Sequence, residues 1–168
     1  MNFRDEYLSE FDNEMKNTRR MIERVPSDKG EWKPHPKSFA LGHLAQLVAW
    51  IPGWIANTAA VKALDLASAP RYSFEKTDKL LAMFDENVKN AKAAIAKLTD
   101  KSLDEQWSLT RGDMVLFSTP RGPALRQHMS HLAHHRGQLS VYLRLIDVPV
   151  PPVYGPTADE KVGFLASS

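Results

Sequence analysis

The sequence predicts an all-α fold, a four-helix bundle formed by a single domain over residues 1–168. Apolar side chains recur at steps of three and four residues in four long stretches, a spacing that places them on one face of an α-helix. Segments that hold proline or glycine separate the stretches. Because 43% of the 168 residues are hydrophobic, the chain can bury a core without disulfides. Four helices of about 20 to 27 residues then imply a bundle.

The first predicted helix lies near the N-terminus and ends before Pro26, because the residue before a proline disfavours the α conformation. Residues 26 to 37 contain three prolines and a glycine and are predicted to form a loop. The apolar face of this helix consists of Phe3, Tyr7, Phe11, Met15, Thr18 and Ile22.

The second predicted helix covers residues 39 to 60, with Ser38 as its N-cap. Pro52 falls inside this helix and is expected to kink or shorten it. Residues 66 to 73 break the pattern and are predicted to be a connection. The inner face of the helix consists of Ala40, His43, Leu47, Trp50 and Trp54.

The third predicted helix ends near residues 99 and 100. Residues 100 to 119 are mixed in character, and the apolar run at 115 to 117 is compatible with a short hairpin or an extended loop. The connections after the second and third helices are long, so the helices need not follow a simple up-and-down order. The apolar positions of the third helix are Leu81, Phe84, Val88, Ala91, Ile95 and Leu98.

The fourth predicted helix runs from about 120 to about 146, with Thr119 as its cap and Pro120 in its first turn. Gly137 costs about 1 kcal/mol of helix stability against alanine, so we expect a backbone or a ligand to approach closely there. The proline-rich residues 148 to 152 cannot continue the helix. The apolar stripe of the helix is Leu125, Met129, Leu132, Leu139, Leu143 and Ile146. A polar stripe beside it holds His128, His131, His135, Gln138 and Tyr142.

The composition excludes several functional classes. Twenty-two basic and 20 acidic residues give a net charge of +2, and their even distribution argues against a nucleic-acid partner. The chain has no cysteine, which excludes disulfides, thiolate metal ligands and a cysteine nucleophile. A polar N-terminus and the lack of an 18-residue apolar stretch predict a cytoplasmic protein without membrane contact. Glycine-rich phosphate loops, Gly-x-Ser-x-Gly elbows and HExxH motifs are also missing.

Three histidines form the candidate site. His131 and His135 are four residues apart, so a helix stacks their rings on one face, where two imidazoles can bind one metal ion. His43 on the second helix is the candidate third ligand. Three imidazoles leave a coordination position open, and an open position is typical of catalytic metal sites. The alternative is that these histidines are hydrogen-bonded core residues.

The neighbours of the pair have alternative roles as well. His128 is a weaker candidate ligand, whereas His134 and His35 are expected to be structural or exposed. Arg136 either binds substrate or forms a salt bridge. Gln138 and Tyr142 share the polar stripe and are candidates to contact the site or the substrate. Trp32 and Trp107 fall in connections and are candidates to line a pocket mouth or an interface.

Four segments together resemble the DinB/YfiT-like superfamily of metalloenzymes. They are residues 38–47 (SFALGHLAQL), 131–139 (HLAHHRGQL), 142–144 (YLR) and 149–156 (PVPPVYGP). The resemblance covers the chain from the first helix to Tyr154. It implies an up-down-down-up four-helix bundle, a divalent metal held at positions matching His43, His131 and His135, and a homodimer.

The resemblance also implies a function. Characterised relatives include transferases and isomerases that use a low-molecular-weight thiol, and a metal ion deprotonates a thiol that coordinates it. We therefore expect a metal-dependent enzyme that transfers such a thiol to a small electrophile, with Arg136, Gln138 or Tyr142 orienting the partner. Metal-assisted hydrolysis and a non-catalytic stress-response protein clamped by metal are the alternatives. Imidazole ligands suit zinc, nickel and iron alike, so the metal is not specified.

Overall fold

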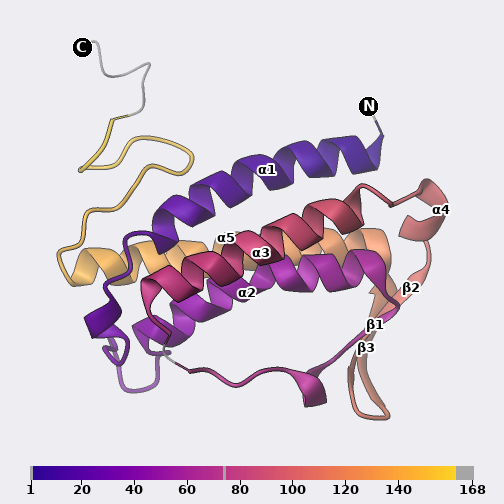
Figure 1. Ribbon diagram of the computed structural model, residues 1–168, viewed down its shortest axis with the longest axis horizontal. Coiled ribbons are helices and arrows are strands. Elements are labelled where there is room, and N and C mark those ends of the chain that lie inside the picture. The colour runs from indigo at the N-terminus through magenta and orange to yellow at the C-terminus, as the bar shows by residue number, and fades with distance from the viewer. Residues whose placement is uncertain (1, 74, 162–168) are drawn as a thin grey trace.

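Four long helices lie side by side in the computed structural model, which describes residues 2–73 and 75–161 (Figure 1). Within these residues a small three-stranded sheet accompanies the helices. The helices are α1 (Phe3–Ile22), α2 (Leu41–Ala60), α3 (Thr77–Ile95), the short α4 (Asp100–Leu103) and α5 (Arg121–Leu145). The strands are β1 (Ala63–Asp65), β2 (Gln106–Arg111) and β3 (Met114–Pro120).

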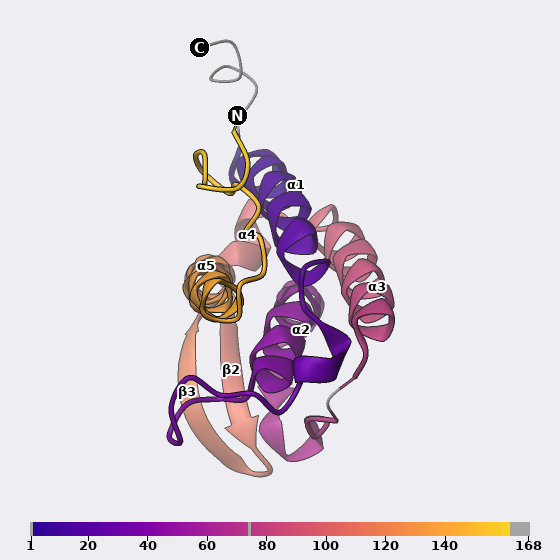
Figure 2. The same cartoon turned by 90° about the vertical axis from the view of Figure 1, so that its left-hand side faces the viewer.

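Helix α2 occupies the centre of the arrangement. It packs most extensively against α3 and next against α5, and the end-on view places it between those two helices, with α1 above (Figure 2). Helices α2 and α3 run in one direction, whereas α1 and α5 run in the other (Figure 1). The core between them is apolar and includes fully buried Phe11, Leu44, Phe84, Leu132 and Leu139.

The start of α2 differs from the prediction. Ser38 does not cap the helix, which begins at Leu41 and has no side-chain cap. Instead, the backbone N–H of Leu41 donates to the carbonyl of Trp32, and that of Gly42 donates to the carbonyl of Gly30 (both 2.9 Å). The preceding loop therefore satisfies amides that a capping side chain would otherwise satisfy. This contact fixes the beginning of α2, where His43 lies.

Pro52 does not shorten α2, which continues to Ala60. Proline removes one backbone donor from the helix. Beside it, the Asn87 side chain of α3 donates a hydrogen bond to the carbonyl of Ala49 (3.0 Å). Asn87 approaches so closely that a Cβ at Gly53 would lie 2.9 Å from its Oδ1. The helix therefore continues through Pro52, and it packs closely against α3 at this point.

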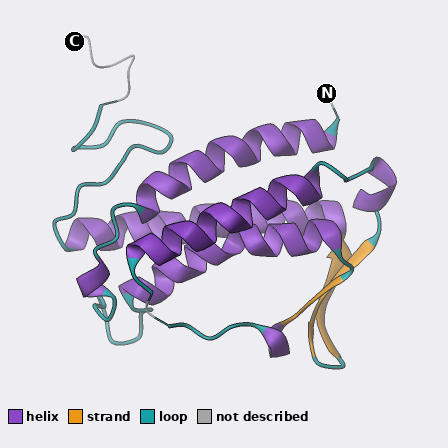
Figure 3. Ribbon diagram, in the orientation of Figure 1, coloured by secondary structure: helices purple, strands orange, loops and turns teal. Residues whose placement is uncertain are grey.

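The sheet corrects the all-α prediction, which is right only for the helical part of the chain. Strands β2 and β3 form an antiparallel hairpin within residues 100–120, and β1 pairs parallel to β2. Gly112 adopts a positive φ of 57° at the hairpin turn, a conformation that glycine tolerates best. The sheet lies at one end of the helices, beyond the end of α2 (Figure 3). The predicted short hairpin is therefore the correct alternative.

Helix α5 begins one residue later than predicted, because Pro120 is still part of β3 and Arg121 starts the helix. It ends at Leu145, and Asp147 follows with a φ of 59°. The N–H groups of Asp147 and Val148 then donate to the carbonyls of Arg144 and Leu143, which closes the helix end. The proline-rich segment after it is non-helical, as predicted.

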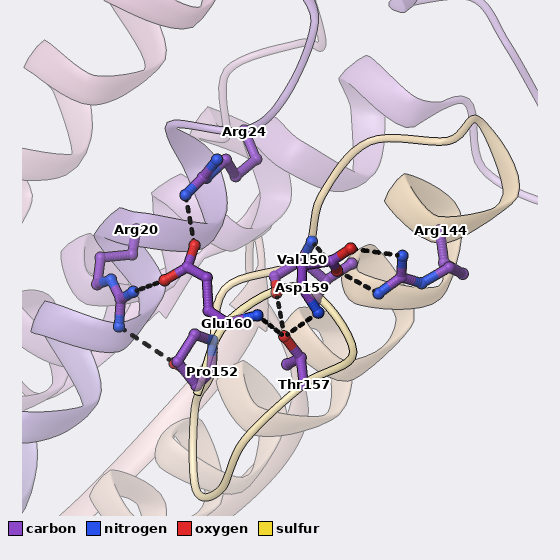
Figure 4. A network of polar contacts seen from close by, with 8 residues as sticks. All are labelled: Arg20, Arg24, Arg144, Val150, Pro152, Thr157, Asp159 and Glu160. Atoms are coloured by element: carbon purple, nitrogen blue, oxygen red, sulfur yellow. Dashed lines mark hydrogen bonds and ion pairs between the residues drawn. The ribbon is translucent and has the colours of Figure 1, made fainter. Parts of the chain in front are cut away.

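The C-terminal segment folds back over α1 and α5 (Figure 4). The Glu160 carboxylate pairs with Arg20 of α1 and with Arg24 just after that helix, each at 2.6 Å. Asp159 pairs with Arg144 of α5 and accepts a hydrogen bond from the backbone of Val150. These contacts join the outer ends of α1 and α5. Across the described residues, no helix is both long and apolar enough to cross a membrane.

Candidate metal centre

His131 and His135 converge on the face of α5 that lies toward the sheet and α2. Their Nε2 atoms are 2.8 Å apart, and the ring centroids are separated by 4.6 Å. The spacing of four residues along the helix produces this contact. A single ion bound by both rings requires their Nε2 atoms to lie close together, and they do.

Gln138 fixes the orientation of one ring of the pair. Its Oε1 lies 2.7 Å from Nδ1 of His135. Because this oxygen only accepts hydrogen bonds, Nδ1 carries the proton and Nε2 of the neutral ring keeps its lone pair. Nε2 of His131 then donates to Nε2 of His135. A metal-binding histidine needs the same arrangement, with one ring nitrogen anchored and the other free to bind.

His43 lies two residues into α2 and is held by aromatic neighbours. Its ring stacks on Phe39 at a centroid distance of 4.2 Å and also packs against Tyr72 from the segment before α3. The described residues show no hydrogen bond between His43 and either member of the pair on α5. The third predicted ligand is therefore positioned separately from the other two.

Burial lowers the pKa of all three histidines. For His43, burial lowers the pKa most, and the charges of Lys33 and His135 lower it further. The pair on α5 is therefore close enough to affect the pKa of His43. For His131, the charges of His135 and His134 add to burial. For His135, the hydrogen bond to Gln138 partly offsets burial. All three rings are thus favoured in the neutral form that binds metal ions.

The chemistry of these donors fits a divalent ion, although their grouping is incomplete. Across residues 2–73 and 75–161, no set of three His, Cys, Asp or Glu side chains is arranged to hold an ion. Two neutral imidazoles converge, one of them anchored through its second nitrogen. Binding by three histidines therefore requires a rearrangement that brings His43 and the pair together.

Arg136 does not face the histidine pair. It is 2% exposed, and its guanidinium forms an ion pair with Glu14 of α1 at 2.6 Å. It also donates to Thr18 Oγ1 (3.0 Å) and to the Tyr154 hydroxyl (2.6 Å). Of its two predicted roles, the structure shows the salt bridge, made between helices. The expectation that Arg136 contacts substrate stays a prediction.

The other polar-stripe residues divide between the site and its supports. Tyr142 donates to the carbonyl of Phe39 (3.3 Å), the residue that stacks on His43, so it supports the loop before α2. His128 Nε2 lies 3.0 Å from Thr58 Oγ1 and links α5 to α2. His134 is exposed, as expected. In the exposed loop, His35 Nδ1 accepts a hydrogen bond from the backbone of Lys37.

Of the two expectations for Gly137, the close approach of another backbone is wrong, and the approach of a ligand stays a prediction. A Cβ built at this position meets no described atom within 4 Å, other than those of its own helix and chain neighbours. Neither a backbone nor a side chain approaches closely there, because this part of α5 is exposed. The glycine therefore has no packing role among the described residues.

A cavity of about 540 Å³ borders His131 between the sheet, α2 and α5. Trp107 lines this cavity, which agrees with the first of its two predicted roles, a place at a pocket. Three lining residues come from the sheet and were not predicted from the sequence: Leu64, Leu109 and Phe117. A signal was present, since Trp107 and Leu109 alternate with polar neighbours as on one face of a strand.

Comparisons with known proteins now identify the family. The DinB family profile matches residues 1–162. The chain belongs to the DinB family. It is 26% identical over 166 residues to the uncharacterized protein YrdA of Bacillus subtilis (strain 168), covering 95% of this chain and 93% of YrdA.

Two solved DinB-like proteins share the fold. One, YjoA from Bacillus subtilis, superposes with a TM-score of 0.70 at 20% identity, covering 88% of this chain and 97% of YjoA. The other, from Bacillus cereus ATCC 10987, gives 0.68 at 21% identity, covering 88% of this chain and 95% of its own. At this level of identity the likeness shows the DinB fold alone. The histidines must therefore be interpreted from their own geometry.

Proposed function

We propose that this DinB protein is a metal-dependent enzyme that transfers a low-molecular-weight thiol to a small electrophile. The divalent ion would be held by His43, His131 and His135. The observation that carries the proposal is the 2.8 Å approach of the Nε2 atoms of His131 and His135. Two neutral imidazoles side by side, one of them at the edge of the cavity, offer two nitrogen ligands to one ion.

The chain's own residues prepare this site. Gln138 keeps the proton of His135 on Nδ1, so that Nε2 is available as a ligand. Tyr142 holds the carbonyl of Phe39, and Phe39 in turn supports the ring of His43. When bound, a divalent ion would lower the pKa of a coordinated thiol and supply the thiolate nucleophile. Three histidine ligands leave a position open for it.

The thiol must be a second substrate, because the chain contains no cysteine. In the transfer, the thiol sulfur forms a bond to a carbon of the electrophile while the leaving group departs with its electron pair. The thiol proton passes to solvent. The reaction balances without an oxidant or a reductant.

The surroundings of the pair favour a thiol over water as the nucleophile. Among the described residues, no carboxylate forms a hydrogen bond or ion pair with His131 or His135. Attack by water usually relies on a neighbouring general base such as a carboxylate. A thiol has a pKa near 8.5 even when free, so it requires less activation.

The test is to incubate zinc-loaded protein with a thiol, such as cysteine or glutathione, and 1-chloro-2,4-dinitrobenzene. Mass spectrometry then separates the thiol conjugate from the hydrolysis product. We expect conjugate above the uncatalysed rate, lost in His135→Ala and retained in His134→Ala. Hydrolysis product in place of conjugate would contradict thiol transfer. Equal rates for wild type and His135→Ala would contradict the site.

A further inference from the structure

The cavity beside His131 has walls from both the helices and the sheet. Its volume is about 540 Å³, which is ample for a fused aromatic ring system. His131 belongs both to this cavity and to the histidine pair. Any molecule in the cavity therefore lies next to the candidate metal ligands. The main walls are Trp54, Leu64, Trp107, Leu109, Phe117 and His128.

We propose that this cavity binds the uncharged, aromatic or bulky aliphatic part of the electrophile and directs its reactive carbon toward His131. The role of the cavity as a substrate site rests on the proposed function. Binding of such a molecule can nevertheless be measured without any metal or reaction.

The walls select against charge. Among the described residues that line the cavity, none is Asp, Glu, Lys or Arg. A charged ligand would lose its hydration there without gaining an ionic partner, which is costly. An apolar ring would instead leave water and gain contact with the two tryptophans. Gln127 and Ser130 also line the cavity and offer hydrogen bonds to a neutral polar substituent.

His128 contributes to this wall as a fixed, neutral ring. Its Nε2 is tied to Thr58 Oγ1 at 3.0 Å. Trp107 packs edge-on against it, with ring centroids 5.6 Å apart and an angle of 87° between the planes. Trp107 itself is 2% exposed. This side of the cavity is thus preformed, which reduces the entropy lost when a rigid ligand binds.

The hairpin provides a matched pair of positions. Phe117 pairs with Leu109 across β2 and β3, and both line the cavity. Leu116 is the preceding residue of β3, lies where the pairing register between β2 and β3 shifts, and does not line the cavity. Leu116 and Phe117 are each 42% exposed. The same substitution at the two positions therefore separates loss of the cavity from general damage to the hairpin.

The experiment uses calorimetry with two probes of similar size, neutral 1-naphthalenemethanol and anionic 1-naphthoate. We expect the neutral probe to bind the protein as purified with one site, and to bind at least about tenfold tighter than the anion. In wild type the proton resonances of the His131 ring should shift on addition of the neutral probe, and those of His35 should not. Lack of neutral binding, equal affinity for both probes, or an unchanged His131 would overturn the proposal.

The variants extend the test. Phe117→Asp should weaken binding of the neutral probe by at least about tenfold, whereas Leu116→Asp should stay within about twofold of wild type. Equal losses in both variants would count against the cavity. Circular dichroism shows whether each variant is folded, and the comparison of probes in wild type does not depend on it.

The proposed function can fail separately from this inference. His135 does not line the cavity, so His135→Ala should retain the neutral probe while losing metal. Probe binding in a protein that takes up no metal would contradict the metal centre and leave the apolar binding site standing. Metal uptake without probe binding would overturn the cavity assignment and leave the metal centre standing.

Discussion

Two consecutive residues of α5, His135 and Arg136, show opposite ways of placing a polar side chain in a helical protein. Arg136 points to α1, where Glu14, Thr18 and Tyr154 engage its guanidinium. His135 points to the other side, where its polar contacts are another histidine and a glutamine. The arginine is held by partners from two parts of the chain, α1 and the C-terminal segment, whereas the histidine keeps a lone pair directed at a second imidazole.

The difference teaches how to separate support from chemistry within one sequence motif. A buried polar group whose hydrogen bonds are satisfied by distant elements stabilises the fold, and it has little capacity left for a ligand. A neutral imidazole whose partner is another imidazole still has a nitrogen lone pair that can bind a metal ion. We therefore assign the α1 side of α5 to stability and the sheet side to function.

We expect the greatest loss of stability when the polar contacts between Arg136 and α1 are removed. Arg136→Ala should reduce the free energy of unfolding by about 3–5 kcal/mol, because Glu14 would remain buried without its counter-charge. Urea denaturation measures this change. Arg144→Ala removes an ion pair on the same helix whose arginine is exposed, and it should cost much less, because solvent screens an exposed pair. Similar losses for the two variants would contradict the comparison.

The second prediction concerns pH and His128. Burial, followed by the charge of His131, lowers the pKa of His128 to about 4. The unfolded chain takes up this proton near pH 6.5, so stability should fall as the pH drops from 6.5 toward 4, by up to about 3 kcal/mol from this residue. Unfolding of wild type and His128→Gln at pH 7 and pH 4.5 tests it. A variant that loses as much stability as wild type would show that His128 titrates normally.

The third prediction addresses the functional side through Gln138. Gln138→Ala removes the acceptor that holds the His135 proton on Nδ1, and it should weaken zinc binding by about 10- to 100-fold. Calorimetric titration measures the affinity. Gln127→Ala is the matched control, because it removes a glutamine of the same helix that does not contact the pair. Unchanged zinc affinity in Gln138→Ala would mean that Gln138 does not position the ligand.

The smallest effect is expected at Gly137, between the two sides. No described atom outside its own helix would meet a Cβ there, so Gly137→Ala should raise the free energy of unfolding by about 1 kcal/mol through helix propensity. Thermal unfolding and zinc titration check the variant together. Lower stability would reveal a contact at this position, and altered zinc binding would reveal a functional role.

The helices could be predicted because their apolar spacing is local information. The four long helices follow the stripes of three- and four-residue steps, and the proposed turn residues fall at their ends. The beginning of α2 could not be predicted, because backbone carbonyls at Gly30 and Trp32 replace the side-chain cap expected from Ser38. Such contacts depend on how the loop folds and leave no composition signal.

The candidate site could be predicted only in part, because some of its contacts join residues that are distant in sequence. The separation of His131 and His135 fixes their contact through helix geometry. The α1 partners of Arg136, Glu14 and Thr18, lie 118 or more residues away in sequence, so its neighbours gave no indication that it faces α1. The cavity required the pairing of β1, β2 and β3, which joins residues 63–65 to a distant hairpin. Long-range pairing of this kind is invisible to local periodicity.

We propose that His43, His131 and His135 together hold one divalent ion between α2 and α5. Metal content by mass spectrometry on untagged protein tests it most directly, with wild type, His43→Ala and His134→Ala compared after equilibration with zinc. We expect about one ion per chain in wild type and His134→Ala, and a loss in His43→Ala. No uptake by wild type, or full retention by His43→Ala, would contradict it.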